Sequence, residues 1–216
     1  MFSRRYSLTL LAALIFYPSL SASAQEVAET PAKSEGISYG FVIDNSGSFR
    51  KLLEDVIAFV GKVLDEQKPA DEAFFVRFVN TEKIKLDQEL TSDPSEIRDS
   101  ADNMYIEGGQ AAILDAIRSA GNYLAENGKQ DLAARRSILI VTHGDDTVSV
   151  TKPEQAIKIM KDAGIRLVAV AVSDEKVQTK LLERMTRETG GKLFVLKHKG
   201  ELRSIGGEVA AALRNP

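Results

Sequence analysis

Residues 37–48 read ISYGFVIDNSGS: seven mostly apolar residues, then a short polar turn that carries one acid and two serines. A run this short, rich in β-branched and aromatic residues, is typical of a strand that is covered on both faces. The next segment, 49–66, places its apolar side chains at helical spacing and predicts an amphipathic helix. A buried strand that leads directly into a helix is the first unit of an α/β sheet.

The same alternation continues along the chain. Further strands are predicted at 73–79, 82–90, 137–142, 166–172 and 192–196. Further helices are predicted at 91–103, 111–126, 153–163 and 176–189, and within 199–214. Segment 82–90 alternates apolar and polar residues, as a half-exposed edge strand does. We therefore predict an α/β fold: a doubly wound, mostly parallel six-stranded sheet with one antiparallel edge strand and helices on both faces.

The first residues indicate export. Arg4 and Arg5 precede an apolar stretch, 8–15, that is too short to span a bilayer, and small residues then lead to a cleavage site after Ala24. We expect a signal peptide at 1–24, a flexible linker at 25–36 and one domain at 37–214. The general secretory and twin-arginine routes both stay open. The expected location is periplasmic or secreted, with no membrane insertion after cleavage.

Composition narrows the possible functions. The chain has no cysteine, which excludes disulfides, thiolate metal sites and cysteine nucleophiles. Removal of the signal peptide, which contains two arginines and no acid, takes the net charge from −3 to −5. Basic residues form no stripe along the chain. Nucleic acid and anionic membrane surfaces are therefore not expected partners.

The turn after the first strand carries the most distinctive chemistry. In a doubly wound sheet, ligands gather at the carboxyl ends of the strands. There, Asp44, Ser46 and Ser48 form a D-x-S-x-S string that places a carboxylate and two hydroxyls on one turn. Such hard oxygens can converge on Mg²⁺ or another small cation. The alternative is a plain turn in which Ser48 caps the helix that starts near Phe49.

The D-x-S-x-S string resembles the metal-ion-dependent adhesion site of von Willebrand factor A (VWA) domains. The resemblance continues in the family's order through FVRF, LDQELTSD, GGQAAILDAI and ILIVTHGDD, at residues 75–78, 86–93, 108–117 and 138–146. It therefore covers nearly all of 37–213. It implies the VWA fold and, with it, a protein-binding module that presents the top of the sheet to a partner, and not an enzyme.

Two positions depart from the family's metal site. The family has a threonine where this chain has Gln110 or Ala111, depending on the alignment, and an aspartate where it has His143. The site implied by the resemblance is thus a degenerate one: Asp44, Ser46 and Ser48, with Gln110 and His143 as substitute ligands. Fewer oxygens and one charge fewer should weaken Mg²⁺ binding.

This set of residues does not by itself establish that a cofactor binds. A weakly bound Mg²⁺, Mn²⁺ or Zn²⁺ is one reading, since His143 with Asp44 favours a softer ion. The other is a metal-free pocket in which His143 hydrogen-bonds Asp44 or a serine.

Two functions are compatible with these residues. If the chain binds a protein, we expect the contacts to come from loops 45–49, 106–112 and 144–152. The residues expected to make them are Asn45, Gly109, Gln110, Ala111, Asp145 and Asp146. The alternative is a hydrolase that uses Asp44, Ser46 or Ser48 with His143. Against it, Ser46 lies in no G-x-S-x-G elbow and no oxyanion-hole loop is recognisable. The D-x-D string of phosphatases is also absent, since Ser46 occupies its second position.

Overall fold

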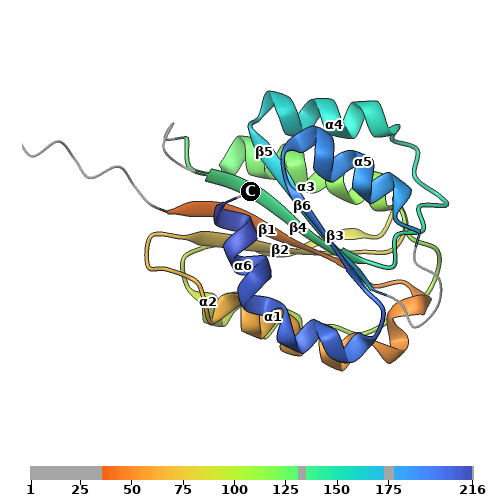
Figure 1. Cartoon of the computed structure of the whole chain (residues 1–216), viewed down its shortest axis with the longest axis horizontal. Coiled ribbons are helices and arrows are strands. Elements are labelled where there is room, and N and C mark those ends of the chain that lie inside the picture. Colours follow the sequence, from red (N-terminus) through yellow and green to blue (C-terminus); the bar gives the residue numbers. More distant parts are fainter. Residues whose placement is uncertain (1–35, 131–134, 173–177, 216) are drawn as a thin grey trace, which may run out of the picture. The chain divides into compact units, whose positions relative to one another are not determined.

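The computed structural model describes residues 36–130, 135–172 and 178–215. Within them, six strands form one sheet in the order β3-β2-β1-β4-β5-β6 (Figure 1). The strands are β1 (Ile37–Asp44), β2 (Glu72–Phe78), β3 (Ile84–Thr91), β4 (Arg135–Thr142), β5 (Ile165–Val172) and β6 (Lys192–Leu196). Strand β3 runs antiparallel to β2, and the other neighbouring pairs in the described sheet are parallel. The predicted topology is confirmed.

Helices cover both faces of the sheet (Figure 1). The α-helices are α1 (Leu53–Leu64), α2 (Pro94–Asp102), α3 (Ile113–Asn127), α4 (Pro153–Asp162), α5 (Lys180–Thr189) and α6 (Gly206–Arg214). Two 3₁₀ helices, η1 (Gly47–Lys51) and η2 (Lys199–Ser204), follow β1 and β6. Helices α1, α2 and α6 lie on one face, and α3, α4 and α5 lie on the other.

Each face of the sheet has its own apolar core. In β1, Phe41 and Ile43 belong to the core beneath α1 and α6, whereas Val42 belongs to the core beneath α3. All three side chains are fully buried. Successive side chains of a strand point to opposite faces, so a strand covered on both sides is apolar at most of its positions. This explains the mostly apolar run 37–43, in which the buried Ser38 donates a hydrogen bond from its hydroxyl to Glu72 Oε1.

The segment after β1 differs from its prediction. A single helix was expected over 49–66, but the structure has η1, a break at Leu52, and then α1. Phe49 lies inside the 3₁₀ turn and is buried against the α1 side of the sheet. Ser48 is also inside that turn, so its predicted role as a helix cap is wrong. At α2, Asp93 caps the helix, because its Oδ1 accepts a 2.8 Å hydrogen bond from Ser95 N.

The predicted signal peptide and residues 25–35 of the predicted linker lie outside the described residues. None of the helices in the described ranges has the length and apolar character needed to cross a bilayer.

Candidate functional site

The D-x-S-x-S turn lies at the carboxyl end of β1, between β2 and β4, where the direction of strand winding reverses. Asp44 is fully buried there. Its Oδ1 accepts a 2.9 Å hydrogen bond from Ser46 N, and its Oδ2 accepts a 2.7 Å bond from Thr142 Oγ1. Burial raises the pKa of Asp44, and the hydrogen bonds from Ser46 and Thr142 and the proximity of His143 offset this only in part. The carboxylate thus fastens the β1 turn to the end of β4.

The two serines of the turn pair with each other. Ser46 Oγ and Ser48 Oγ lie 2.9 Å apart, and Ser48 is exposed. The backbone of the turn is held from the neighbouring strand and loop: Asn45 N donates to Phe78 O at 2.7 Å, and Gly47 N donates to Gly109 O at 3.4 Å. The hydroxyl pair is therefore held at a fixed position at the surface.

The loop before α3 completes one side of the site. Gly109 has a φ of +101°, a left-handed conformation that favours glycine, and an added Cβ would lie 2.9 Å from Val79 Cγ1. Ala112 N donates to Val79 O at 2.7 Å, and Thr147 N donates to Ala111 O at 3.3 Å. Loops from three strand ends are thereby joined through their backbones.

Arg77 anchors the same loop from the other side. Its guanidinium, on β2, donates to Asp87 Oδ2 of β3 at 2.6 Å and to Glu107 Oε1 at 2.7 Å, and it lies 4.7 Å from the centre of the Tyr105 ring. Glu107 directly precedes the Gly108-Gly109 turn. These two partly buried ion pairs fix the start of the loop whose next residues line the site.

These loops enclose a small pocket of about 140 Å³. It is lined by Ser46, Ser48, Gly109, Gln110, Ala111, His143, Asp145 and Thr147. The structure therefore brings together the serines, Gln110 and His143 that the sequence singled out. Asp44 lies beneath them and does not line the pocket.

Two of the residues expected to touch a partner are buried. Asn45 is fully buried, and both polar atoms of its side chain lack a hydrogen-bond partner within the described structure. Ala111 is 5 % exposed. Their direct contact with a partner is therefore not supported, because the tight turn aims Asn45 inward and Ala111 packs under the adjoining loop. Gly109, Gln110 and Asp145 are exposed, and Asp146 is half-buried.

The residues of the alternative hydrolase lie close together, but no chain of hydrogen bonds joins them in the described structure. His143 Nδ1 is buried and has no hydrogen-bond partner in the described ranges. The hydrogen bonds of Ser46 and Asp44 go to Ser48, to the backbone and to Thr142. A serine nucleophile needs a base in hydrogen-bond contact that is itself oriented by a third group. The described geometry does not supply this arrangement.

The donor set also fits a metal ion poorly. Both Asp44 oxygens already accept hydrogen bonds, and Ala111 offers only a methyl group where a hydroxyl would serve as ligand. The described residues contain no group of three or more histidines and acids placed to hold a metal. Mg²⁺ in proteins depends on carboxylate oxygens to offset its charge. We therefore assign no chemical step to a bound cation.

Asp115 is an organising residue that was not singled out from the sequence. It is buried in the first turn of α3 and accepts hydrogen bonds from Thr81 Oγ1 at 2.5 Å, Val150 N at 3.1 Å and Thr151 N at 2.9 Å. Burial acts to raise the pKa of Asp115, but these hydrogen bonds outweigh it and leave the pKa lowered. The available signal was an acid inside the apolar run 113–117.

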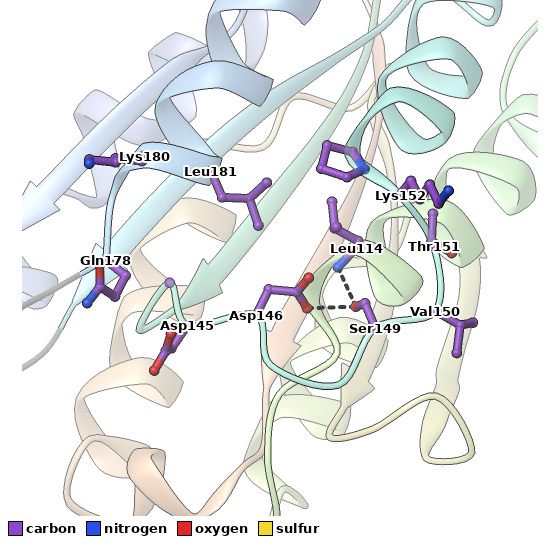
Figure 2. Close-up of a pocket in the computed structure, with 12 residues that line it drawn as sticks. Leu114, Asp145, Asp146, Ser149, Val150, Thr151, Lys152, Gln178, Lys180 and Leu181 are labelled. Atoms are coloured by element: carbon purple, nitrogen blue, oxygen red, sulfur yellow. Dashed lines mark hydrogen bonds between the residues drawn. The ribbon is translucent and has the colours of Figure 1, made fainter.

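A larger groove of about 590 Å³ lies beside the small pocket, between loop 144–152 and the start of α5 (Figure 2). Asp145 lines both cavities. On the floor of the groove, Asp146 Oδ1 accepts hydrogen bonds from Ile113 N at 2.8 Å and Ser149 Oγ at 2.6 Å. Burial raises the pKa of Asp146, although the bonds from Ser149 and the α3 backbone lower it. Gly144 starts this loop with a φ of +92°.

A comparison with models of protein families identifies one family. The family model described as "von Willebrand factor type A domain" matches residues 40–207. A search of curated proteins gave no match.

Solved structures with the same fold come from several bacteria. An aerotolerance-related membrane protein from Bacteroides fragilis aligns with a TM-score of 0.67 at 15% identity, covering 84% of this chain and 100% of that one. The conserved hypothetical protein BatB from Bacteroides thetaiotaomicron gives a TM-score of 0.62 at 14% identity, with 83% and 100% covered. A von Willebrand factor type A protein from Catenulispora acidiphila gives 0.68 at 16% identity, with 83% and 43% covered. At these identities the likeness shows the fold alone.

Proposed function

The chain belongs to the von Willebrand factor type A domain family, and on that basis we propose that it is an exported module that binds a protein partner at the carboxyl end of its sheet. Domains of this family are generally interaction modules and not enzymes. The observation that carries the proposal is the way in which the loops at the carboxyl end of the sheet are held together. Loops from three strands are joined by backbone hydrogen bonds, and they hold an exposed polar surface around a small pocket. A surface fixed in this way loses little conformational entropy when a partner binds.

The exposed part of this surface is small and polar. Ser48, Gln110, Asp145 and Thr147 are exposed around the pocket, and Val150, 74 % exposed, adds an apolar side chain nearby. Polar groups at known binding sites orient the partner, and a few apolar side chains supply contact area. This mixture favours recognition of a folded or extended protein segment.

We propose that this recognition needs little or no divalent cation. Asp44 is committed to Ser46 N and Thr142 Oγ1. His143 adds a nitrogen to the pocket in place of a carboxylate. The partner is then recognised through direct hydrogen bonds with the polar residues in the pocket and around its rim.

The test is site-directed photo-cross-linking in the cells that make the protein. A benzoylphenylalanine replaces Gln110 at the rim of the pocket, and in a matched control it replaces Glu126, an exposed residue at the far end of α3. We expect a cross-link to a protein from position 110 and none from 126, with the same yield in EDTA. Equal cross-linking from both positions, or none from 110, contradicts the proposal.

A further inference from the structure

The groove beside the small pocket holds a carboxylate without a cation. Asp146 points into it, and its Oδ1 accepts the two hydrogen bonds from Ile113 N and Ser149 Oγ (Figure 2). Its Oδ2 accepts no hydrogen bond from the described residues, and neither Asp145 nor Asp146 forms an ion pair within the described ranges. One oxygen of a half-buried carboxylate therefore remains available to a ligand.

Apolar side chains line part of the same groove. Leu114, Leu181 and Pro153 contribute to the walls of the groove, and Val150 stands at its edge. Two lysines, Lys152 and Lys180, also line it, but Figure 2 shows both side chains extending away from Asp146. A carboxylate that is desolvated beside apolar groups and lacks a cation is costly, and an incoming cation offsets that cost.

A long side chain with a cationic end matches this arrangement. Its methylenes can lie along the leucines while its charge reaches the carboxylate. Because Oδ1 already accepts two hydrogen bonds, the groove does not offer the pair of free oxygens that a guanidinium binds in bidentate fashion. An ammonium, which acts as a compact charge, needs only the one oxygen.

We propose that this groove receives a lysine side chain of the protein partner, with its ammonium bound to Asp146 Oδ2 between Leu114 and Leu181. The inference rests on the proposed function, because it takes the partner to lie across this end of the sheet. The groove is distinct from the pocket around Ser46 and His143, and Asp145 lines both.

The first experiment is an NMR titration of the isotope-labelled protein with three blocked tripeptides, acetyl-Gly-X-Gly-amide, in which X is lysine, norleucine or glutamate. We expect the lysine peptide to shift the amides of Leu114, Ser149, Val150 and Leu181. We expect it to bind about tenfold more tightly than the norleucine peptide, as a charge-assisted hydrogen bond predicts. Equal binding of the norleucine peptide overturns the proposal. Tighter binding of the glutamate peptide also overturns it, and shows instead that Lys152 and Lys180 define an anion site.

The second experiment uses Asp146→Asn. Asparagine keeps an oxygen for Ile113 N and Ser149 Oγ but turns the free oxygen into an amide donor without charge. We expect about tenfold weaker lysine-peptide binding, whereas Asp102→Asn, at an exposed site on α2, leaves it unchanged. Leu181→Lys, which keeps Asp146 and places an ammonium inside the groove, is a second variant and should also block the peptide. Unchanged binding in both groove variants overturns the proposal.

Cross-linking from position 110 separates this inference from the proposed function. If wild-type protein cross-links to a partner and Asp146→Asn weakens that cross-link, both stand. If the cross-link survives in Asp146→Asn and the lysine peptide does not bind, the lysine inference fails and the proposed function stands. If position 110 gives no cross-link at all, the proposed function fails, whatever the peptide does.

Discussion

Thr142 Oγ1 donates a 2.7 Å hydrogen bond to Asp44 Oδ2, although 98 positions separate the two residues in the chain. Both are buried, at the carboxyl ends of the neighbouring parallel strands β4 and β1. The bond satisfies a carboxylate that burial would otherwise leave short of donors. It also fixes the turn that carries Ser46 and Ser48 relative to the loop that carries His143.

Removing that hydroxyl should destabilise the protein. Thr142→Val keeps the shape of the side chain but leaves Asp44 Oδ2 without its donor, a loss of about 1–3 kcal/mol for a buried group. Urea unfolding at neutral pH measures the change. Thr147→Val, at an exposed position of the adjoining loop, is the control and should cost less than about 0.5 kcal/mol. Equal effects of the two substitutions would show that the bond to Asp44 adds no stability.

Asp115→Asn should destabilise the protein in a pH-dependent way. Because the pKa of Asp115 is lowered in the folded state, the stability gained from its ionised form is present above the unfolded pKa of about 3.9. That stability is lost as the pH falls through the folded pKa. The cost of the substitution, about 1–3 kcal/mol at pH 7, should therefore shrink below about pH 4.

Urea unfolding of wild-type and Asp115→Asn protein between pH 3 and pH 7 tests this. Asp102→Asn, at an exposed acid on α2, should show a small and nearly constant difference. A cost for Asp115→Asn that is the same at every pH would mean that its carboxylate is not stabilised by Thr81 and the backbone of 150–151.

Val170→Asp should unfold the domain. Val170 is fully buried in β5 between Val141 of β4 and Phe194 of β6, so an added carboxylate has no partner there and costs several kcal/mol. Val150→Asp makes the same change at a residue that is 74 % exposed and should leave the melting temperature almost unchanged. A soluble Val170→Asp protein that melts like wild type would contradict the described sheet.

Millimolar Mg²⁺ should stabilise the wild-type protein little. At a concentration equal to its dissociation constant, a ligand adds only about 0.4 kcal/mol, and weaker binding adds less. Ala111→Thr combined with His143→Asp restores a hydroxyl and a carboxylate beside Ser46 and Ser48. We expect Mg²⁺, but not EDTA, to raise the melting temperature of this double variant.

Thermal melts of both proteins with Mg²⁺, Zn²⁺ and EDTA decide between a pocket that binds a divalent cation and a metal-free pocket. A wild-type melting temperature several degrees higher in Mg²⁺ would mean that His143 and Gln110 are adequate ligands. A wild-type response to Zn²⁺ alone would support a site made by Asp44 and His143. A double variant that gains nothing would mean that the two substitutions do not complete a cation site.

The exported protein should begin at Gln25. The basic start, the short apolar stretch and the small residues before it predict cleavage after Ala24. N-terminal sequencing of protein recovered from outside the cytoplasm is the direct measurement. Recovery from the cytoplasm with Met1 still in place would contradict export.

The sequence predicted the sheet well because its strands are covered on both faces. A run such as 37–43 is mostly apolar on both of its faces because helices cover both sides of the strand, and this property does not depend on distant details. The break between η1 and α1 was missed. Phe49, Leu52 and Val56 fit helical spacing whether or not the first turn is a 3₁₀ helix, so the pattern alone does not separate the two.

The site was predicted in part. Ser46, Ser48, Gln110 and His143 follow strand ends that meet at one edge of the sheet, and they do line one pocket. The direction in which the Asn45 side chain points depends on the geometry of the turn, and the sequence pattern alone does not reveal that geometry. Asp146 and loop 144–152 were expected to contact a partner, but the groove itself was not predicted, because Leu114, this loop and Leu181 come from three distant parts of the chain.

The strand order also has a consequence for synthesis. Among the described strands, β1 is made first, but it lies between β2 and β4, and its second neighbour is complete only at Thr142. Until then, the growing chain carries a strand that is apolar on both faces and has one unpaired edge, a state prone to aggregation. If the chain is exported as we propose, a chaperone that holds it extended would keep that edge covered until β4 arrives. Any fragment that ends before residue 135 lacks this neighbour permanently, together with His143, Asp145 and Thr147 of the pocket, so we expect such a fragment to be insoluble.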